Sequence, residues 1–219
     1  MKKIFCKEMR KTWIVTVIAL VLAVVGIMIM PDIIPTHFGP SGAPDAWGSK
    51  YTVLMYPGIL VLVSTLAVPM IKVDPKMANY ERFGKYYYDF FFGFALFFVA
   101  VEVSNIAIAL GMDINVGSII CFVVGIMMFF VGNMMPKIKQ NYFFGIKTPW
   151  ALNDEDNWFK THRLGGKTFV ISGIVIMASA FLPGEFKIWG LAVTIPFMVL
   201  VPAVYSYLIF KRKQSEQES

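Results

Sequence analysis

Six long apolar segments constrain this chain of 219 residues more than any other feature of its sequence. A bilayer core about 30 Å thick requires roughly 17–25 helical residues per crossing. The segments are Trp13–Met30, Tyr51–Ile71, Tyr87–Leu110, Val116–Met135, Thr168–Leu182 and Ile188–Phe210. The fifth is the shortest, and must borrow flanking residues or thin the bilayer locally. The sequence therefore predicts an all-α integral membrane protein, a six-helix transmembrane bundle.

The cations lie almost entirely in one set of connecting segments. Of the 20 Lys and Arg residues, all but Lys50 and Lys187 fall in four places: the basic tail 1–12, the loop 72–86, the loop 136–167 and the tail 211–219. Cationic loops stay cytoplasmic during insertion, so both termini are expected to be cytoplasmic. Because these cations cluster at the ends of apolar segments, a lipid-facing role fits them better than direct nucleic-acid binding.

The division of the chain follows from these segments. Residues 13–110 hold the first three helices and an extracellular loop, 31–50, whereas 111–210 hold the last three helices and a cytoplasmic loop, 136–167. Four prolines and three glycines in the outer loop predict tight turns rather than a helix. Within this loop His37 and Asp45 have two interpretations: a hydrogen-bonded brace, or part of a metal or peptide site.

The inner loop is expected to contain a short helix of its own. Asn153 is suited to cap it, and Asp154-Glu155-Asp156 suit the positive end of its dipole. Gly165-Gly166 would end it. Trp158, Phe159 and His162 are expected to share one face, at spacings of three and four residues, which predicts a helix lying along the inner membrane surface. Lys137, Lys139 and Lys147 indicate contact with anionic lipid, or with an acidic partner.

One acidic residue lies inside the third apolar segment. An acid there costs roughly 2.5–3.5 kcal/mol on insertion scales, so Glu102 is expected to face the bundle or a wet pocket. Its two interpretations are a neutral clasp with Asn105, Ser104 or a serine of another helix, and a proton, cation or peptide-contact site.

Two stretches of sequence resemble a known family. The inner stretch runs from Asn133 through Asn141-Tyr-Phe-Phe-Gly-Ile-Lys-Thr-Pro-Trp150 to Trp158-Phe-Lys-Thr-His162-Arg-Leu-Gly-Gly-Lys167, and is similar to the signature loop of SdpI-type immunity proteins. The outer stretch, Ile34-Pro-Thr-His37 to Lys50, resembles the extracellular module of unknown function at the amino end of the same family.

The resemblance implies a multi-pass protein of the bacterial plasma membrane that protects its host from a secreted antimicrobial peptide toxin. It also implies signalling, in which a cytosolic ArsR-type autorepressor is recruited to the membrane. The residues expected to contact the toxin are His37, Gly42, Asp45, Trp47, Lys50, Glu102 and Asn105. Those expected to form the partner-binding loop are Asn133, Pro136, Lys137, Asn141, Tyr142, Gly145, Lys147, Thr148, Pro149, Trp150, Trp158, Thr161, His162, Arg163, Gly165, Gly166 and Lys167.

Transport is the competing hypothesis, and catalysis is not expected. The sequence contains no Gly-rich phosphate loop, nucleophile elbow or His-Glu-x-x-His string, so we expect no catalytic residues, metal or cofactor. Pro196 and Pro202 interrupt the sixth segment, and a broken helix with a buried acid such as Glu102 is typical of translocation sites. The sequence has no detectable repeat relating its first three segments to its last three.

Overall fold

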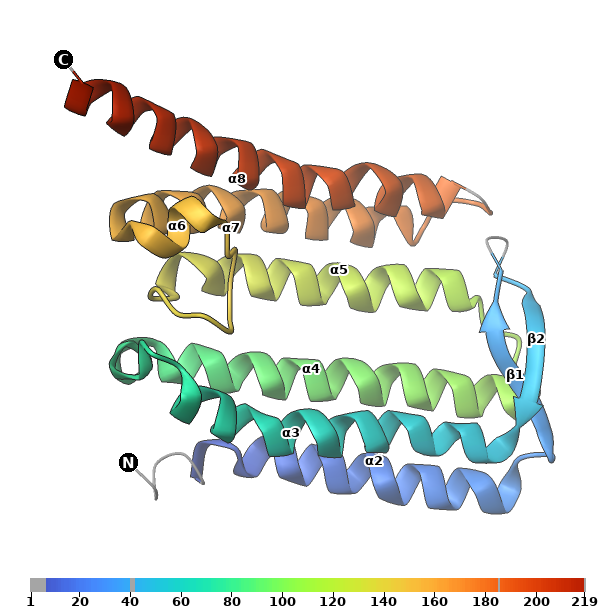
Figure 1. Ribbon diagram of the computed structural model, residues 1–219. Helices are drawn as coiled ribbons and strands as arrows, with labels where there is room; N and C mark the ends of the chain where they lie inside the picture. The colour runs from blue at the N-terminus through green and yellow to red at the C-terminus, as the bar shows by residue number, and fades with distance from the viewer. Residues whose placement is uncertain (1–6, 40–41, 185, 219) are drawn as a thin grey trace.

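The computed structural model describes residues 7–39, 42–184 and 186–218 as a helical bundle with a β-hairpin across one end (Figure 1). Residues 1–6 of the predicted basic tail lie outside the described residues. The elements in chain order are α2 (Arg10–Ile29), β1 (Ile33–Phe38), β2 (Pro44–Ser49), the 3-10 helix η1 (Lys50–Leu54), α3 (Met55–Val73), η2 (Met77–Asn79), α4 (Tyr80–Ala109), α5 (Val116–Met134), η3 (Met135–Lys137), α6 (Pro149–Asn153), α7 (Glu155–Ser179) and α8 (Phe186–Glu218).

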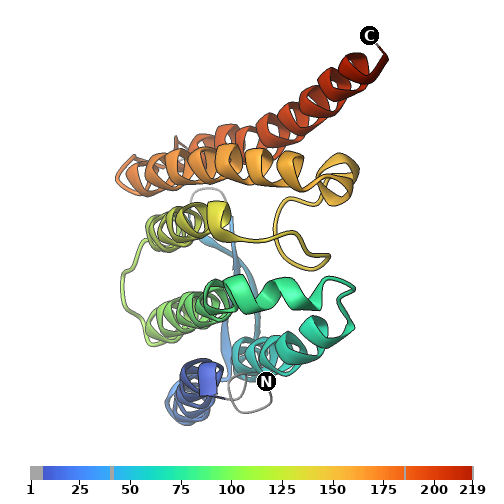
Figure 2. The ribbon, with the colours of Figure 1, turned by 90° about the vertical axis from the view of Figure 1, so that its left-hand side faces the viewer.

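The long helices form two groups that meet at α4 and α5. Helices α2, α3 and α4 pack together, as do α5, α7 and α8, and α4 lies beside α5 (Figures 1 and 2). Figure 1 shows the start of α2 and the end of α8 at the same end of the bundle, opposite the hairpin. We call these the loop end and the hairpin end. The predicted placement of both termini on one side agrees with this arrangement, whereas the side that faces the cytoplasm stays a prediction.

Five helical segments are long and apolar enough to cross a membrane. Among the described residues they are Arg10–Ile29, Lys50–Val73, Met77–Ala109, Val116–Lys137 and Phe186–Glu218. Their outward side chains suit a lipid solvent: Val17 and Val21 of α2, for example, are each more than half exposed. The sequence prediction of a multi-pass helical membrane protein is therefore confirmed, while the count of six spans stays a prediction.

The predicted fifth span and inner-surface helix are one continuous helix, which corrects the sequence analysis. Helix α7 begins after Asp154, whose side chain accepts hydrogen bonds from the N–H groups of Asp156 and Asn157; Asn153 belongs to α6 and is not the cap. The helix then passes through Gly165 and Gly166 without ending. These glycines mark a close helix crossing instead, because a Cβ on Gly166 would lie 2.7 Å from the carbonyl oxygen of Gly132.

The inner half of α7 is also not a surface helix. Trp158 and His162 are only 2% and 1% exposed, while Phe159 points outward. The three residues therefore do not share one face, because a helix turns by about 100° per residue and neighbouring positions diverge.

The outer loop forms a β-hairpin, which the all-α prediction did not include. Strands β1 and β2 pair antiparallel, with Ile33 opposite Ser49 and Pro35 opposite Trp47. Of their side chains only Ile34 is fully buried, in a cluster with Ala23 and Val53 that fixes the hairpin to α2 and η1. The strands lack the alternating apolar pattern that identifies a half-buried strand. The sequence therefore predicted turns, from its prolines and glycines, but no strands.

Candidate functional site

At the loop end, the side-chain amide of Asn141 is buried at the centre of residues 138–148 and organises their backbone. The side chain of Asn141 donates to the carbonyl oxygens of Lys139 and Phe144, at 2.9 and 2.8 Å. Its oxygen accepts from the N–H groups of Phe143 and Phe144, and lies 3.2 Å from the Tyr80 hydroxyl. Both amide donors and the acceptor are therefore satisfied inside the protein, as burial of an amide requires. This loop is an ordered element of the structure.

The same loop is tied to the first helix group. Asp74, which is 4% exposed, accepts hydrogen bonds from the Tyr80 hydroxyl and the Tyr142 N–H, both at 2.9 Å. Gln140 donates to the carbonyl oxygens at the end of α6 and accepts from the Lys76 ammonium. The link between α3 and α4 therefore reaches across the bundle to the predicted signature loop.

Trp158 and His162 form the buried floor of this loop. Their rings stack with centroids 4.0 Å apart, and the Trp158 indole donates to the carbonyl oxygen of Ile138. His162 Nε2 accepts from the Ile146 N–H at 3.0 Å, so the other ring nitrogen, Nδ1, carries the proton and donates to the Trp158 carbonyl oxygen. Burial lowers the pKa of His162 to about 4, so the ring is neutral at physiological pH.

Gly145 is required where the loop passes over His162. Its φ of 113° lies in the left-handed region, and a Cβ there would overlap the His162 ring. Only glycine therefore lets the loop pack against His162, which lies 17 positions later in the sequence.

A hydrogen-bond network joins α6, α7 and α8. Asn157 accepts from the hydroxyls of Thr161 and Ser206, and donates to the Ser206 carbonyl oxygen at 2.8 Å. Because the Ser206 hydroxyl donates to Asn157, the Thr148 hydroxyl 2.6 Å away must donate to Ser206. Thr148 in turn accepts from the Ala151 N–H and caps α6. Asn157 and Ser206 were not among the predicted residues.

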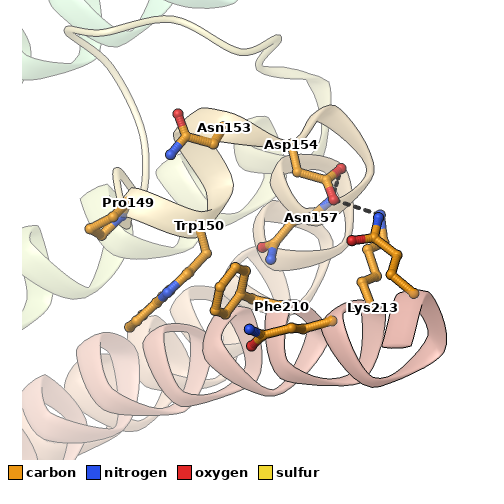
Figure 3. Close-up of a pocket in the computed structure, with 9 residues that line it drawn as sticks. Pro149, Trp150, Asn153, Asp154, Asn157, Phe210 and Lys213 are labelled. Carbon is orange, nitrogen blue, oxygen red and sulfur yellow. Dashed lines mark hydrogen bonds and ion pairs between the residues drawn. The ribbon is translucent and has the colours of Figure 1, made fainter. Parts of the chain in front are cut away.

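A pocket of about 590 Å³ opens at this end between α6, the start of α7 and the end of α8 (Figure 3). Trp150 and Phe210 form its apolar wall, and the Tyr207 ring is tilted against that of Trp150, with centroids 5.1 Å apart. Lys213 binds the carboxylates of Asp154 and Asp156, at 2.6 and 2.8 Å. The pocket thus combines a half-buried tryptophan with a charged rim.

These ion pairs favour the charged forms of both acids. Burial raises the pKa of Asp154, but the hydrogen bonds from Lys213 and from the N–H groups of Asn157 and Asp156 outweigh it, so the pKa lies below its ordinary value. The Lys160 hydrogen bond, followed by that of Lys213, lowers the pKa of Asp156.

Most of the other predicted loop residues lie along α5, η3 and α7, where Gly165 and Gly166 are buried and the charged residues are exposed. A groove of about 510 Å³ is lined by Asn133, Pro136, Arg163, Gly166 and Lys167, with Phe159 at its side. The Lys137 ammonium lies over the Tyr86 ring, 4.8 Å from its centre. Tyr142 and Lys147 are exposed on the loop itself. The predicted loop residues therefore divide into a buried scaffold and two exposed surfaces.

At the hairpin end, His37 and Asp45 are paired across the strands. Their side chains are 2.5 Å apart and exposed, which supports the brace interpretation. Within the described ranges, no group of three or more His, Cys, Asp or Glu residues is placed to hold a metal ion. Lys50 instead binds Asp32, at 3.0 Å, and Trp47 is 59% exposed. Of the predicted outer residues, His37 and Gly42 line one cavity and His37 and Asn105 a second, whereas Asp45, Trp47 and Lys50 line neither.

Of the two interpretations of Glu102, the hydrogen-bonded clasp is not formed among the described residues. Asn105 donates to the Pro35 carbonyl oxygen of β1, at 3.2 Å, and the Ser104 hydroxyl donates within α4 to Ala100. Glu102 is fully buried, and neither of its oxygens has a hydrogen-bond partner among the described residues. It lies on the α4 face that also carries Ala95 and Ile106, between two apolar clusters shared with α2 and α3.

Several residues at these sites were missed by sequence reasoning. Asp74 had a visible signal, as an acid in a cationic loop three positions after the apolar segment that ends at Ile71. Lys187 had another, as one of two cations outside the cationic loops. Tyr80, Gln140 and Ser206 had none, since their importance depends on partners from other helices.

Comparisons with known proteins cover both ends of the structure. Residues 137–209, from η3 to α8, match the SdpI/YfhL protein family, and residues 14–61, from α2 through the hairpin into α3, match a domain of unknown function, DUF1648. The immunity protein SdpI of Bacillus subtilis strain 168 is 32% identical over 112 residues, which are 51% of this chain and 54% of the relative. The chain thus spans about half the length of that curated relative. No solved structure matches the chain.

Proposed function

Because residues 137–209 match the SdpI/YfhL family, we propose that this chain is an immunity protein of the bacterial plasma membrane. In this proposal it protects its host from a secreted antimicrobial peptide that reaches the hairpin end. The distribution of Lys and Arg supports an orientation in which the loop end and both termini are cytoplasmic.

The observation that carries the proposal is the ordered loop beside an open pocket. Asn141, Trp158 and His162 hold the loop through buried hydrogen bonds, whereas Trp150, Phe210 and Lys213 remain accessible at the rim of the pocket. An aromatic anchor with a charged rim is typical of protein-binding surfaces. We propose that a cytosolic repressor of the ArsR type docks there when the toxin is bound at the other end.

The test uses a toxin-sensitive bacterial strain that expresses the chain and carries a reporter for the repressed promoter. The wild type should raise survival and, with toxin present, release the reporter. Trp150→Ala should keep its membrane abundance and survival but lose reporter release. Trp13→Ala is the matched control, because Trp13 lies at the same end and is 37% exposed, but does not line the pocket. No gain in survival with the wild type would refute the proposal.

Ion-coupled transport is the second candidate, favoured by the buried carboxyl of Glu102, which has no hydrogen-bond partner in the part of the chain that the structure describes. Glu102→Gln separates the two functions in the same strain, because it keeps the shape of the side chain but cannot exchange a proton. An immunity protein should still protect with this variant, and sealed vesicles should show no solute uptake. A Glu102→Gln protein of normal abundance that has lost both protection and uptake would favour transport. Against transport, α8 continues as a helix through Pro196 and Pro202.

A further inference from the structure

A cavity of about 380 Å³ lies beneath the hairpin, between the first turns of α5 and α8. Phe38, Ile120 and Leu191 give it largely apolar walls. It shares His37, Phe38, Val116 and Ile120 with a second cavity of about 230 Å³ between α4 and α5. The space therefore continues from the hairpin into the seam between the two helix groups.

Lys187 brings a buried positive charge into this apolar space. The residue is 7% exposed, and its ammonium donates to the Asn115 side-chain oxygen at 2.9 Å. That oxygen also accepts from the Ser118 N–H, so Asn115 is held by the start of α5. Within residues 7–39, 42–184 and 186–218, no carboxylate forms an ion pair with Lys187. An ammonium has three donors and a full charge, and one neutral acceptor compensates neither.

Backbone donors converge on the same cavity. Val116 and Gly117 are the first residues of α5, and both line the space. The first N–H groups of a helix have no intrahelical acceptor, and the helix dipole favours an anion beside them. Gly117 lies beside the Lys187 side chain, since a Cβ built on it would be in ordinary van der Waals contact with Lys187 Cδ, at 3.5 Å. Lys187 and the start of α5 thus border the same cavity.

We propose that this cavity binds the carboxylate end of an apolar peptide segment. Lys187 and the start of α5 would hold the carboxylate, and the apolar walls would hold the adjoining side chains. The inference rests on the proposed function, since the peptide would be part of the toxin. A peptide is favoured over a phospholipid because the hairpin roofs the cavity, and because its volume lies in the range of about 300–1,000 Å³ that suits small ligands rather than two acyl chains.

The test measures binding to the purified full chain in nanodiscs of phosphatidylcholine. The probe is a dansyl-labelled tetrapeptide of Leu, Val and Phe with a free carboxyl terminus, compared with the same peptide amidated. The wild type should bind the acid roughly tenfold more tightly than the amide, as expected for a charged hydrogen bond. Lys187→Met should bind both peptides equally, and Lys187→Arg should retain the preference.

Two further variants control for other charges. Lys50→Gln removes the other cation of the hairpin end, which is paired with Asp32, and should leave the preference unchanged. Glu185, two positions before Lys187, lies outside the described residues; Glu185→Gln should also retain the preference if the ligand supplies the counter-charge.

Three results would overturn the inference: equal binding of acid and amide by the wild type, an unchanged preference in Lys187→Met of normal size-exclusion profile, or loss of the preference in Lys50→Gln. Nanodiscs containing phosphatidylglycerol form a separate arm. Weaker acid binding in these discs, seen with Lys50→Gln but not with Lys187→Met, would assign the site to a lipid headgroup and also overturn the inference. Because binding is measured without toxin or cells, a wild type that fails to protect would refute the proposed function and leave this result standing.

Discussion

His162 must be neutral for the loop end to keep its conformation. Its Nε2 accepts the Ile146 N–H, and a second proton on the ring would occupy that acceptor. The pKa of about 4 in the folded protein lies below the ordinary value of 6.5. The unfolded chain therefore binds more protons between these pH values, so the contribution to stability is complete above about pH 6.5 and is lost as the pH falls toward 4.

We expect the melting temperature of the detergent-solubilised protein to fall as the pH is lowered from about 7 to about 4.5. When the contribution of His162 is lost completely, the free energy of unfolding decreases by an amount on the order of 3 kcal/mol. His162→Gln should melt lower at neutral pH and show a flatter pH profile. His37→Gln is the control, because the only other histidine is exposed on the hairpin. A His162→Gln profile as steep as that of the wild type would contradict this assignment.

The recognisable residues of the loop could be identified from the sequence, but their structural roles could not. Gly145, Trp158 and His162 belonged to one recognised string, and they do meet in space. The loop also contacts residues between α3 and the start of α4: Tyr142 binds Asp74 and Asn141 lies beside Tyr80. These partners are more than 60 positions away in the sequence. A contact at that separation depends on how helices pack, which a pattern of local spacing does not encode.

At the scale of elements, α5 and α7 pack through paired glycines. A Cβ on Gly125 would lie 2.7 Å from the Gly173 carbonyl oxygen, and one on Gly132 would lie 2.7 Å from that of Gly166. The helices run antiparallel. On each helix the two glycines are seven positions apart, which is about two helical turns. Small residues let membrane helices approach closely where no hydrophobic effect draws them together. This spacing was the signal that the reading of Gly165-Gly166 as a helix end overlooked.

Gly132→Ala should therefore destabilise the protein, because the added methyl group meets backbone atoms that cannot move aside. Overpacking of this kind costs about 1–3 kcal/mol of unfolding free energy. Gly58→Ala is the matched control in α3, where a Cβ would meet nothing within 4 Å. Thermal unfolding of both variants in the same detergent measures the difference. Equal melting temperatures for the two would show that the crossing is looser than the glycine contacts imply.

At the scale of the whole molecule, the hairpin and the inner loop each bridge the two helix groups from opposite ends. Pro35 of the hairpin accepts a hydrogen bond from Asn105 of α4. Phe38 and Gly42 of the hairpin line a cavity together with residues of α5 and α8. The inner loop joins Asp74 at one side to Ser206, through Thr148, at the other. The bundle and the common end of its termini followed from apolar segments and loop charge. The bridges did not, because they are made by tertiary contacts of polar residues.

The orientation of this arrangement gives the last prediction. In a chain with Cys6 and Cys121 replaced, single cysteines are placed at Ala46 of β2 and Glu155 of α7, both exposed and at opposite ends. A membrane-impermeant maleimide should label Ala46→Cys in intact cells, because Lys and Arg hold the loop end in the cytoplasm during insertion. Glu155→Cys should be labelled only after permeabilisation, and Ser215→Cys near the end of α8 should behave in the same way. Labelling of Glu155→Cys in intact cells, with Ala46→Cys protected, would show the opposite topology. The pocket of Trp150 and Phe210 would then lie outside the cell, where no cytosolic repressor could reach it.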